Sequence, residues 1–230
     1  PILDAASYFG TDDYDQAYFV QLDTEDRPHL CGQTVGSSLA LVGDVYADNP
    51  NGSTFVVRFT SDLDAVDWVT RVGLPQSGID ISPTAFLVSD CDEMYISGWG
   101  GVTNSSNSSN AGQSTTSGMP TTVDAFQIGT DGSDFWLGVL APEASDLTYG
   151  TFLGGTSSND HVDGGTSRFD KNGTVYQAVC ASCGDEDNNP NTFDDDFPTT
   201  VGAWSNEDLS GNCNLGVFKF NLGLLVADIN

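Results

Sequence analysis

The chain has 230 residues and a formal net charge of −27, because 33 acidic residues stand against six basic ones. Such a charge repels phosphate backbones and anionic membrane surfaces, which argues against nucleic-acid binding and membrane association. No apolar run approaches the roughly 20 residues needed to cross a bilayer, so membrane insertion is not expected. Hydrophobic residues make up 38% of the chain, which suffices for a sizeable core.

The acidic residues are unevenly divided, with 28 Asp and only five Glu. Asp favours turns and caps, whereas Glu favours helices. No segment shows sustained apolar periodicity of 3.6 residues, so we predict an all-β fold. The first residues lack a signal-peptide pattern and have the composition of the inside of a strand, so we expect a piece of a longer protein.

The expected strands recur in units of similar order. A strand at 2–10 stands alone and is followed by three units over residues 11–73, 74–154 and 155–230. Each unit starts with a strand after an aromatic-Gly or apolar-Gly segment, then an acidic turn, a second strand, a long loop and a third strand. The next Gly-ended segment is the fourth strand. The expected strands are 15–23, 29–33, 54–59, 69–73, 80–90, 94–99, 135–140, 150–154, 160–170, 174–180 and 215–220.

Two of the long loops close with matching sequences, MPTTVDAF at 119–126 and FPTTVGAW at 197–204. Four-stranded units in tandem are typical of β-propeller blades, so we predict about three blades plus one orphan strand, as part of a larger propeller. The alternative is a β-sandwich with accidental similarity. Phe126 and Trp204 hold equivalent positions, which predicts a place between blades.

Three turn features are predicted from the same alignment. Asp15, Asp80 and Asp160 hold equivalent positions after the Gly-ended segments. Recurrence in every unit indicates that they satisfy backbone N–H groups at turns and have no catalytic role. Asn172 and Gly173 between two strands predict a hairpin with a type I′ turn.

The third unit resembles the SBBP-type seven-bladed propeller repeat. The matching residues are 149–155, 159–160, 168–176, 197–200 and 202–204, and the second unit matches in part. The first unit lacks the Pro-Thr-Thr element. The form with Cys180 to Gly184 is similar to repeats of very large surface proteins of gliding-type bacteria, which precede PKD-like domains and use the type IX secretion route. The tail 224–229 resembles the lead-in to such a domain.

The resemblance implies a location on the bacterial cell surface and a structural or adhesive role, as in gliding-motility adhesins. It carries no catalytic residues. The implied partners are upstream blades and a downstream PKD-like domain of the same polypeptide, surface glycans or other cell-surface proteins. A carbohydrate-binding, lectin-like propeller is the alternative function, and a polysaccharide-degrading enzyme is a third.

Five cysteines leave at least one outside any disulfide within the chain. We expect Cys213 to pair with Cys183 or Cys180, and favour Cys183 because it and Cys213 flank the long loop 184–212. Such a bond would indicate an oxidising, extracellular compartment. A redox motif or half a zinc site at Cys180 and Cys183 is the less favoured interpretation.

Two acidic clusters have oxygen ligands of the kind that Ca²⁺ prefers. They comprise Asp12, Asp13 and Asp15 in one loop, and Asp185, Asp187, Asn189, Asp194, Asp195 and Asp196 in another. A solvated charged loop is the slightly favoured interpretation, and a Ca²⁺ site is the alternative. Trp99, at a strand exit among glycines, is the candidate for stacking on a sugar ring.

Overall fold

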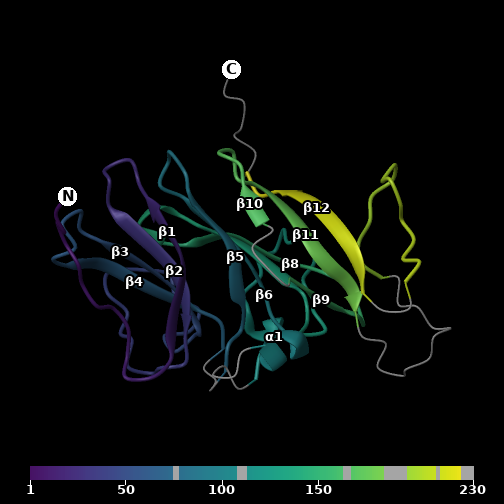
Figure 1. The fold of residues 1–230 in the computed structure, drawn as a ribbon, viewed down its shortest axis with the longest axis horizontal. Coiled ribbons are helices and arrows are strands. Elements are labelled where there is room, and N and C mark those ends of the chain that lie inside the picture. Colours follow the sequence, from purple (N-terminus) through teal and green to yellow (C-terminus); the bar gives the residue numbers. More distant parts are fainter. Residues whose placement is uncertain (75–77, 108–112, 163–166, 184–195, 211–212, 224–230) are drawn as a thin grey trace.

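The computed structural model describes residues 1–74, 78–107, 113–162, 167–183, 196–210 and 213–223, which form three four-stranded antiparallel sheets (Figure 1). Sheet 1 contains β1 (Asp15–Leu22), β2 (Pro28–Thr34), β3 (Thr54–Phe59) and β4 (Val66–Val72). Sheet 2 contains β5 (Ser82–Val88), β6 (Met94–Trp99), β7 (Phe135–Leu140) and β8 (Leu147–Leu153). Sheet 3 contains β9 (Asn159–His161), β10 (Ser167–Phe169), β11 (Thr174–Cys183) and β12 (Asn214–Asn221).

The all-β prediction is confirmed. Sheets 1 and 2 run as simple meanders in which each strand pairs with the next along the chain, and none of the sheets closes into a barrel. The described helices are short: α1 (Val102–Asn107) and the 3₁₀ turns η1 (Thr116–Gly118) and η2 (Pro142–Ala144). None of the helices in the described ranges is long and apolar enough to cross a membrane.

The sheets bury their apolar side chains against one another. One cluster joins sheets 1 and 2 and includes Val56, Trp68 and Trp136. A second joins sheets 2 and 3 and includes Phe135 and Phe218, whose rings lie 5.6 Å apart. Sheet 2 is therefore covered on both faces. This is why β6 and β7 are buried along their whole length and read as continuous apolar segments, with no polar alternation.

The turns that join β1 to β2, β5 to β6 and β10 to β11 have the same hydrogen bonds. The first residue donates its N–H to the carbonyl of the fifth, and the fourth donates to the first; these turns begin at Asp23, Ser89 and Asp170. The fourth residue of each turn takes a positive φ, at Asp26, Asp92 and Gly173. The predicted hairpin at 170–173 is therefore present. A type I′ turn is wrong, because it also needs a positive φ at Asn172, which Asn172 does not have.

A buried arginine holds the long loop of sheet 1. Arg71 on β4 donates from Nε to the carbonyl of Gly52 at 2.8 Å, and from its two terminal nitrogens to those of Leu39 and Gly36 at 3.0 and 3.1 Å. Burial lowers the pKa of its guanidinium, with the charge of Asp15 acting in the opposite direction. Within the described part of the chain, these three carbonyls hold the side chain and no carboxylate is in hydrogen-bond contact with it.

Two expected strands differ from the structure. Residues 2–10 form no strand, because a strand needs a neighbour to pair with and no described strand lies beside them. The expected strand 160–170 is two short ones, β9 and β10, which both pair with β11 at different points along it. The tail 224–229 lies outside the described residues.

Candidate functional site

The three equivalent aspartates close the same turn in each repeat. Asp15 accepts the backbone N–H of Thr11 at 2.5 Å, Asp80 that of Leu74 at 3.3 Å and Asp160 that of Gly155 at 2.8 Å. Each donor is the residue that follows the aligned glycine, at positions 10, 73 and 154. The prediction that these carboxylates satisfy backbone N–H groups is confirmed.

Two of these aspartates also tie their sheet to the preceding one. Asp80 donates its backbone N–H to Ser53 Oγ at 2.7 Å, and its carboxylate accepts the Ser53 hydroxyl at 2.6 Å. Asp160 donates its backbone N–H to the carbonyl of Ser133 at 2.9 Å. Ser53 and Ser133 both lie just before the third strand of their sheets. The junction is thus a repeated polar contact beside each apolar cluster.

A buried carboxylate pair lies at the junction of sheets 2 and 3. Asp134 and Asp160 are 0% and 1% exposed, and Asp134 Oδ1 has no hydrogen-bond partner among the described residues. Burial, together with the charges of neighbouring carboxylates that include Asp131 and Asp196, raises the pKa of each to about 7. Gly154 makes the approach possible, because a Cβ there would lie 1.9 Å from Asp134 Oδ1 and 2.8 Å from Asp160 Oδ2.

The sequence did not single out Asp134, because one Asp among 28 carries no signal of its own. Its position directly before β7 becomes informative only when the fold brings the start of β7 next to the start of sheet 3. The roles of Ser53 and Ser133 likewise depend on contacts between sheets, which the sequence does not reveal.

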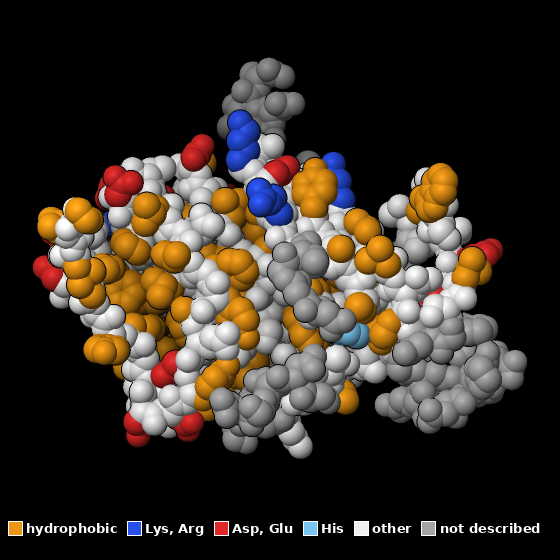
Figure 2. Space-filling model, viewed as in Figure 1, with side chains coloured by type: hydrophobic (Ala, Val, Ile, Leu, Met, Phe, Trp, Pro, Cys, Tyr) orange, Lys and Arg blue, Asp and Glu red, His pale blue; other side chains and the backbone are white. Residues whose placement is uncertain are grey.

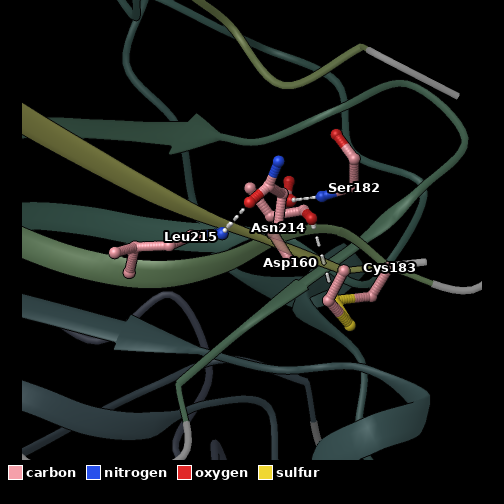
Figure 3. The surroundings of a disulfide bond; sticks show 7 residues. Asp160, Ser182, Cys183, Asn214 and Leu215 are labelled. Atoms are coloured by element: carbon pink, nitrogen blue, oxygen red, sulfur yellow. Dashed lines mark hydrogen bonds between the residues drawn. A yellow bond between two sulfur atoms is a disulfide. The ribbon is translucent and has the colours of Figure 1, made fainter. Parts of the chain in front are cut away.

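A disulfide joins Cys183 at the end of β11 to Cys213 just before β12, with a Cα–Cα distance of 4.2 Å. The favoured pairing is confirmed, and Cys180 is not part of this bond. Figure 3 shows Asp160, Ser182 and Cys183 grouped at this corner, where the backbone N–H of Ser182 donates to Asp160 at 2.9 Å. The bond therefore fixes the base of the loop next to the junction aspartate.

One set of side chains at this corner has the donor types of a soft-metal site. One atom each from His161, Cys183 and Cys213 lies within 4.8 Å of the others. Both sulfurs are held in the disulfide, and a metal needs thiolates. The three side chains could bind zinc only after the disulfide is reduced. In the oxidised form, Cys183 and Cys213 therefore have a structural role.

One of the two Ca²⁺ candidates is the acidic loop around residue 190. Its residues Asp185, Asp187, Asn189, Asp194 and Asp195 lie outside the described residues. Asp196 is described, and its carboxylate accepts the backbone N–H groups of Thr156 and Ser157 at 2.6 and 2.8 Å and the Ser158 hydroxyl. Burial opposes ionisation, yet these bonds hold the pKa of Asp196 below its ordinary value. Its oxygens are already engaged by the protein.

The second Ca²⁺ candidate does not converge on one point. Asp12 accepts the hydroxyl of Ser38 at 3.3 Å, and Asp13 accepts the backbone N–H of Tyr14 at 2.8 Å. The Asp15 carboxylate accepts the backbone N–H and the hydroxyl of Thr11. Within the described ranges, no three carboxylates bring one oxygen each within 4.8 Å of one another.

Trp99 is not available for a sugar. It is 6% exposed, packs in the cluster between sheets 2 and 3, and lies 5.8 Å from the His161 ring. Trp99 pairs across the sheet with Phe135, so sheet 3 covers both rings. The expectation of an exposed stacking surface at Trp99 is wrong.

The aromatic residues expected between blades are the exposed ones. Trp204 is 103% exposed. Phe126 is also exposed, although its ring lies 5.7 Å from that of Phe220 on β12. Each follows a turn closed by an N–H to carbonyl bond, from Ala125 to Thr122 and from Ala203 to Thr200. Figure 2 shows apolar side chains on the outlying loop at the right and over sheet 1 at the left.

No protein-family model matches the chain, and no curated protein matches it significantly. The resemblance to SBBP-type repeats therefore rests on the sequence motifs given above. What the geometry itself supplies is a repeated junction of buried aspartates, serines and glycines, reinforced by one disulfide at the last junction.

Proposed function

We propose that each four-stranded sheet is a propeller blade and that the chain forms an arc of a β-propeller. Three repeated features support this: the strand order of sheets 1 and 2, the shared turn at Asp23, Ser89 and Asp170, and the aspartate junction. Sheets stacked face to face around an axis are the arrangement that propellers use to protect strand edges.

We infer a non-enzymatic, structural and adhesive role in a large secreted protein of the cell surface. The observation that carries this proposal is the recurrent aspartate junction. The Asp80 carboxylate accepts the Leu74 N–H and the Ser53 hydroxyl, and the Asp160 carboxylate accepts the N–H groups of Gly155 and Ser182. The disulfide is consistent with an extracellular protein. The excess of negative charge suits a hydrated outer surface.

Retention of the purified, fluorescently labelled chain on polysaccharide-coated and bacterial surfaces tests the adhesive role. We expect saturable retention that survives washing and leaves the polysaccharide intact. Release of reducing sugars from the coating would instead favour the polysaccharide-degrading enzyme, and retention no greater than that of an equally acidic control protein would reject adhesion.

A carbohydrate-binding propeller is the second candidate, and the exposed side chain of Trp204 favours it. An indole with an open face can stack on a sugar ring. Glycan-array binding that is lost in Trp204→Ala, with unchanged melting temperature, would support this function. Binding that is equal in the two proteins would reject Trp204 as its site.

A further inference from the structure

Sheet 3 ends at an open strand edge. Among the described residues β12 pairs only with β11, whereas the third strands β3 and β7 are each covered by a fourth strand. Val217 on β12 aligns with Val56 on β3 and Leu137 on β7. Val56 and Leu137 pack in the cluster with the following sheet and are 1% and 0% exposed, whereas Val217, beyond which no described sheet lies, is 72% exposed. The open edge of β12 is a template for another strand, and its outer face lacks a covering sheet.

The first ten residues have the sequence of a fourth strand and already occupy part of its position. Gly10 aligns with Gly73 and Gly154, which directly follow β4 and β8. Phe9 packs on Phe55 of sheet 1 with ring centroids 5.6 Å apart, just as the residues before Gly73 and Gly154 join the cluster with the next sheet. Yet residues 1–9 belong to no described strand, and Ile2, Leu3 and Tyr8 are exposed.

Sheet 3 also holds the flanking segment that a fourth strand would meet on its other side. In sheet 2, Thr122 donates its N–H to the carbonyl of Gly150 on β8 at 3.0 Å, so the Pro-Thr-Thr segment borders the fourth strand. In sheet 3 the aligned turn is formed, with Ala203 N–H donating to the Thr200 carbonyl at 3.0 Å. No described strand of sheet 3 lies in the place of β8. A strand added to β12 would run beside residues 198–204.

The N-terminal segment and β12 also carry complementary charges. In sheet 1, Arg58 on β3 pairs with Asp67 beside it on β4 at 3.0 Å. The aligned residues are Lys219 on β12 and Asp4 in the N-terminal segment. In addition, Asp15 Oδ1 is buried without a hydrogen-bond partner in the described structure, although the equivalent aspartate of sheet 2 bonds to a serine of the preceding sheet. No sheet among the described residues precedes the one that contains Asp15.

The outer face of sheet 1 has exposed apolar side chains at positions that are buried in sheet 2. The shared turn aligns Val20 and Leu22 on β1 with Phe86 and Val88 on β5. Phe86 and Val88 are buried against sheet 1, whereas Val20 and Leu22 are exposed. Sheet 1 and β12 lie at opposite ends of the molecule in Figure 1, so one chain cannot bring them together in this conformation.

We propose that residues 2–10 of one copy of this chain add to β12 of a second copy as its fourth strand, and that the reciprocal exchange closes the two copies into one ring. Three sheets in each of two copies give six, within the four to eight blades that propellers use. The exchange is reciprocal about a two-fold axis, so residues 2–10 of each copy contact β12 of the other. This inference rests on the propeller interpretation given under the proposed function.

The register follows from the inner sheets. Thr70 on β4 lies opposite Val56 on β3, and Thr151 on β8 lies opposite Leu137 on β7. The aligned pair between copies is Ser7 with Val217. Directly opposite residues of antiparallel strands place their Cα atoms about 4.5–5.5 Å apart, which a disulfide can bridge.

Cross-linking tests this register directly. The full chain carrying Cys91→Ser, Ser7→Cys and Val217→Cys is oxidised and run under non-reducing conditions, and its mass is measured by light scattering. The matched control replaces Val217→Cys by Val123→Cys, an exposed valine on a loop of sheet 2. We expect a covalent species of twice the chain mass at several times the control yield. A yield equal to the control would overturn the proposal.

Charge reversal provides a test that does not depend on cysteine chemistry. Lys219→Asp should raise the dissociation constant of the two-copy assembly by roughly tenfold or more, and adding Asp4→Lys should restore most of it. Val217→Asp should leave single copies, whereas Val123→Asp should not. A wild-type chain that stays a single copy at high micromolar concentration would overturn the proposal. Assembly is measured by mass, so its failure is separate from failure of surface adhesion.

Discussion

The buried carboxylate of Asp134 gives the sharpest prediction about stability. Its pKa is raised to about 7 by burial and then by the charges of Asp131, Asp160 and Asp196, from an ordinary value of 3.8. Between pH 4 and pH 7 the folded chain therefore binds more protons than the unfolded chain, and the free energy of unfolding falls as the pH rises. Ionised Asp134 costs about 4 kcal/mol at pH 8, from a shift of about three pH units at 1.36 kcal/mol each.

Asp134→Asn keeps the shape of the side chain, removes the charge and supplies an NH₂ group that can donate to the Asp160 carboxylate. We expect the variant to be more stable than the wild type at pH 8 by a few kcal/mol and to differ little at pH 4, where Asp134 is protonated in the folded chain and partly protonated in the unfolded chain. Urea unfolding at both pH values measures this, with the exposed Asp124→Asn as the control for loss of one negative charge. A variant that is less stable than the wild type at pH 8 would refute the reasoning.

Three further predictions concern the disulfide, the junction glycine and the assembly. Replacing Cys183 and Cys213 by Ser should lower the free energy of unfolding by about 4 kcal/mol, because the bond closes a loop of 30 residues; denaturant midpoints equal to those of the wild type would contradict this. Gly154→Ala should lower the melting temperature strongly, because its Cβ would collide with two buried carboxylates, whereas Gly129→Ala, with open space around it, should not. Raising the salt concentration should strengthen the two-copy assembly seen by light scattering, because salt screens the repulsion between copies that each carry a charge of −27. Weakening by salt would contradict the view that this net repulsion outweighs the Lys219–Asp4 attraction.

The repeat period made much of the fold predictable from the sequence. The positions of β2, β3, β6, β7 and β12 follow from apolar segments bounded by acidic turns, and the roles of Asp15, Asp80 and Asp160 follow from their recurrence. The division of the expected strand 160–170 into β9 and β10 was not predictable, because it depends on how far β11 extends beyond its partners.

Exposure was harder to predict than strand position. Trp99 and Trp204 both follow strand or loop segments rich in small residues, and nothing local distinguishes a tryptophan covered by a neighbouring sheet from one that is not. The difference arises because sheet 3 covers Trp99, whereas no described sheet lies beyond sheet 3. The carboxylate of Asp134 was missed for the same reason, since its burial comes from the contact between two sheets.

The anchoring of the sheet 1 loop by Arg71 has a consequence for how that loop can change. Among the described residues, the guanidinium donates hydrogen bonds only to main-chain carbonyls, at Gly36, Leu39 and Gly52. Gly36 and Gly52 themselves must stay glycine, because a Cβ there would lie 2.2 Å from Thr11 Oγ1 or from the Val72 carbonyl oxygen. Between these three points, the loop can accept new side chains or different lengths without losing its attachment to β4. A sheet held in this way can diversify the loop between its anchor points while the arginine keeps the attachment of that loop constant.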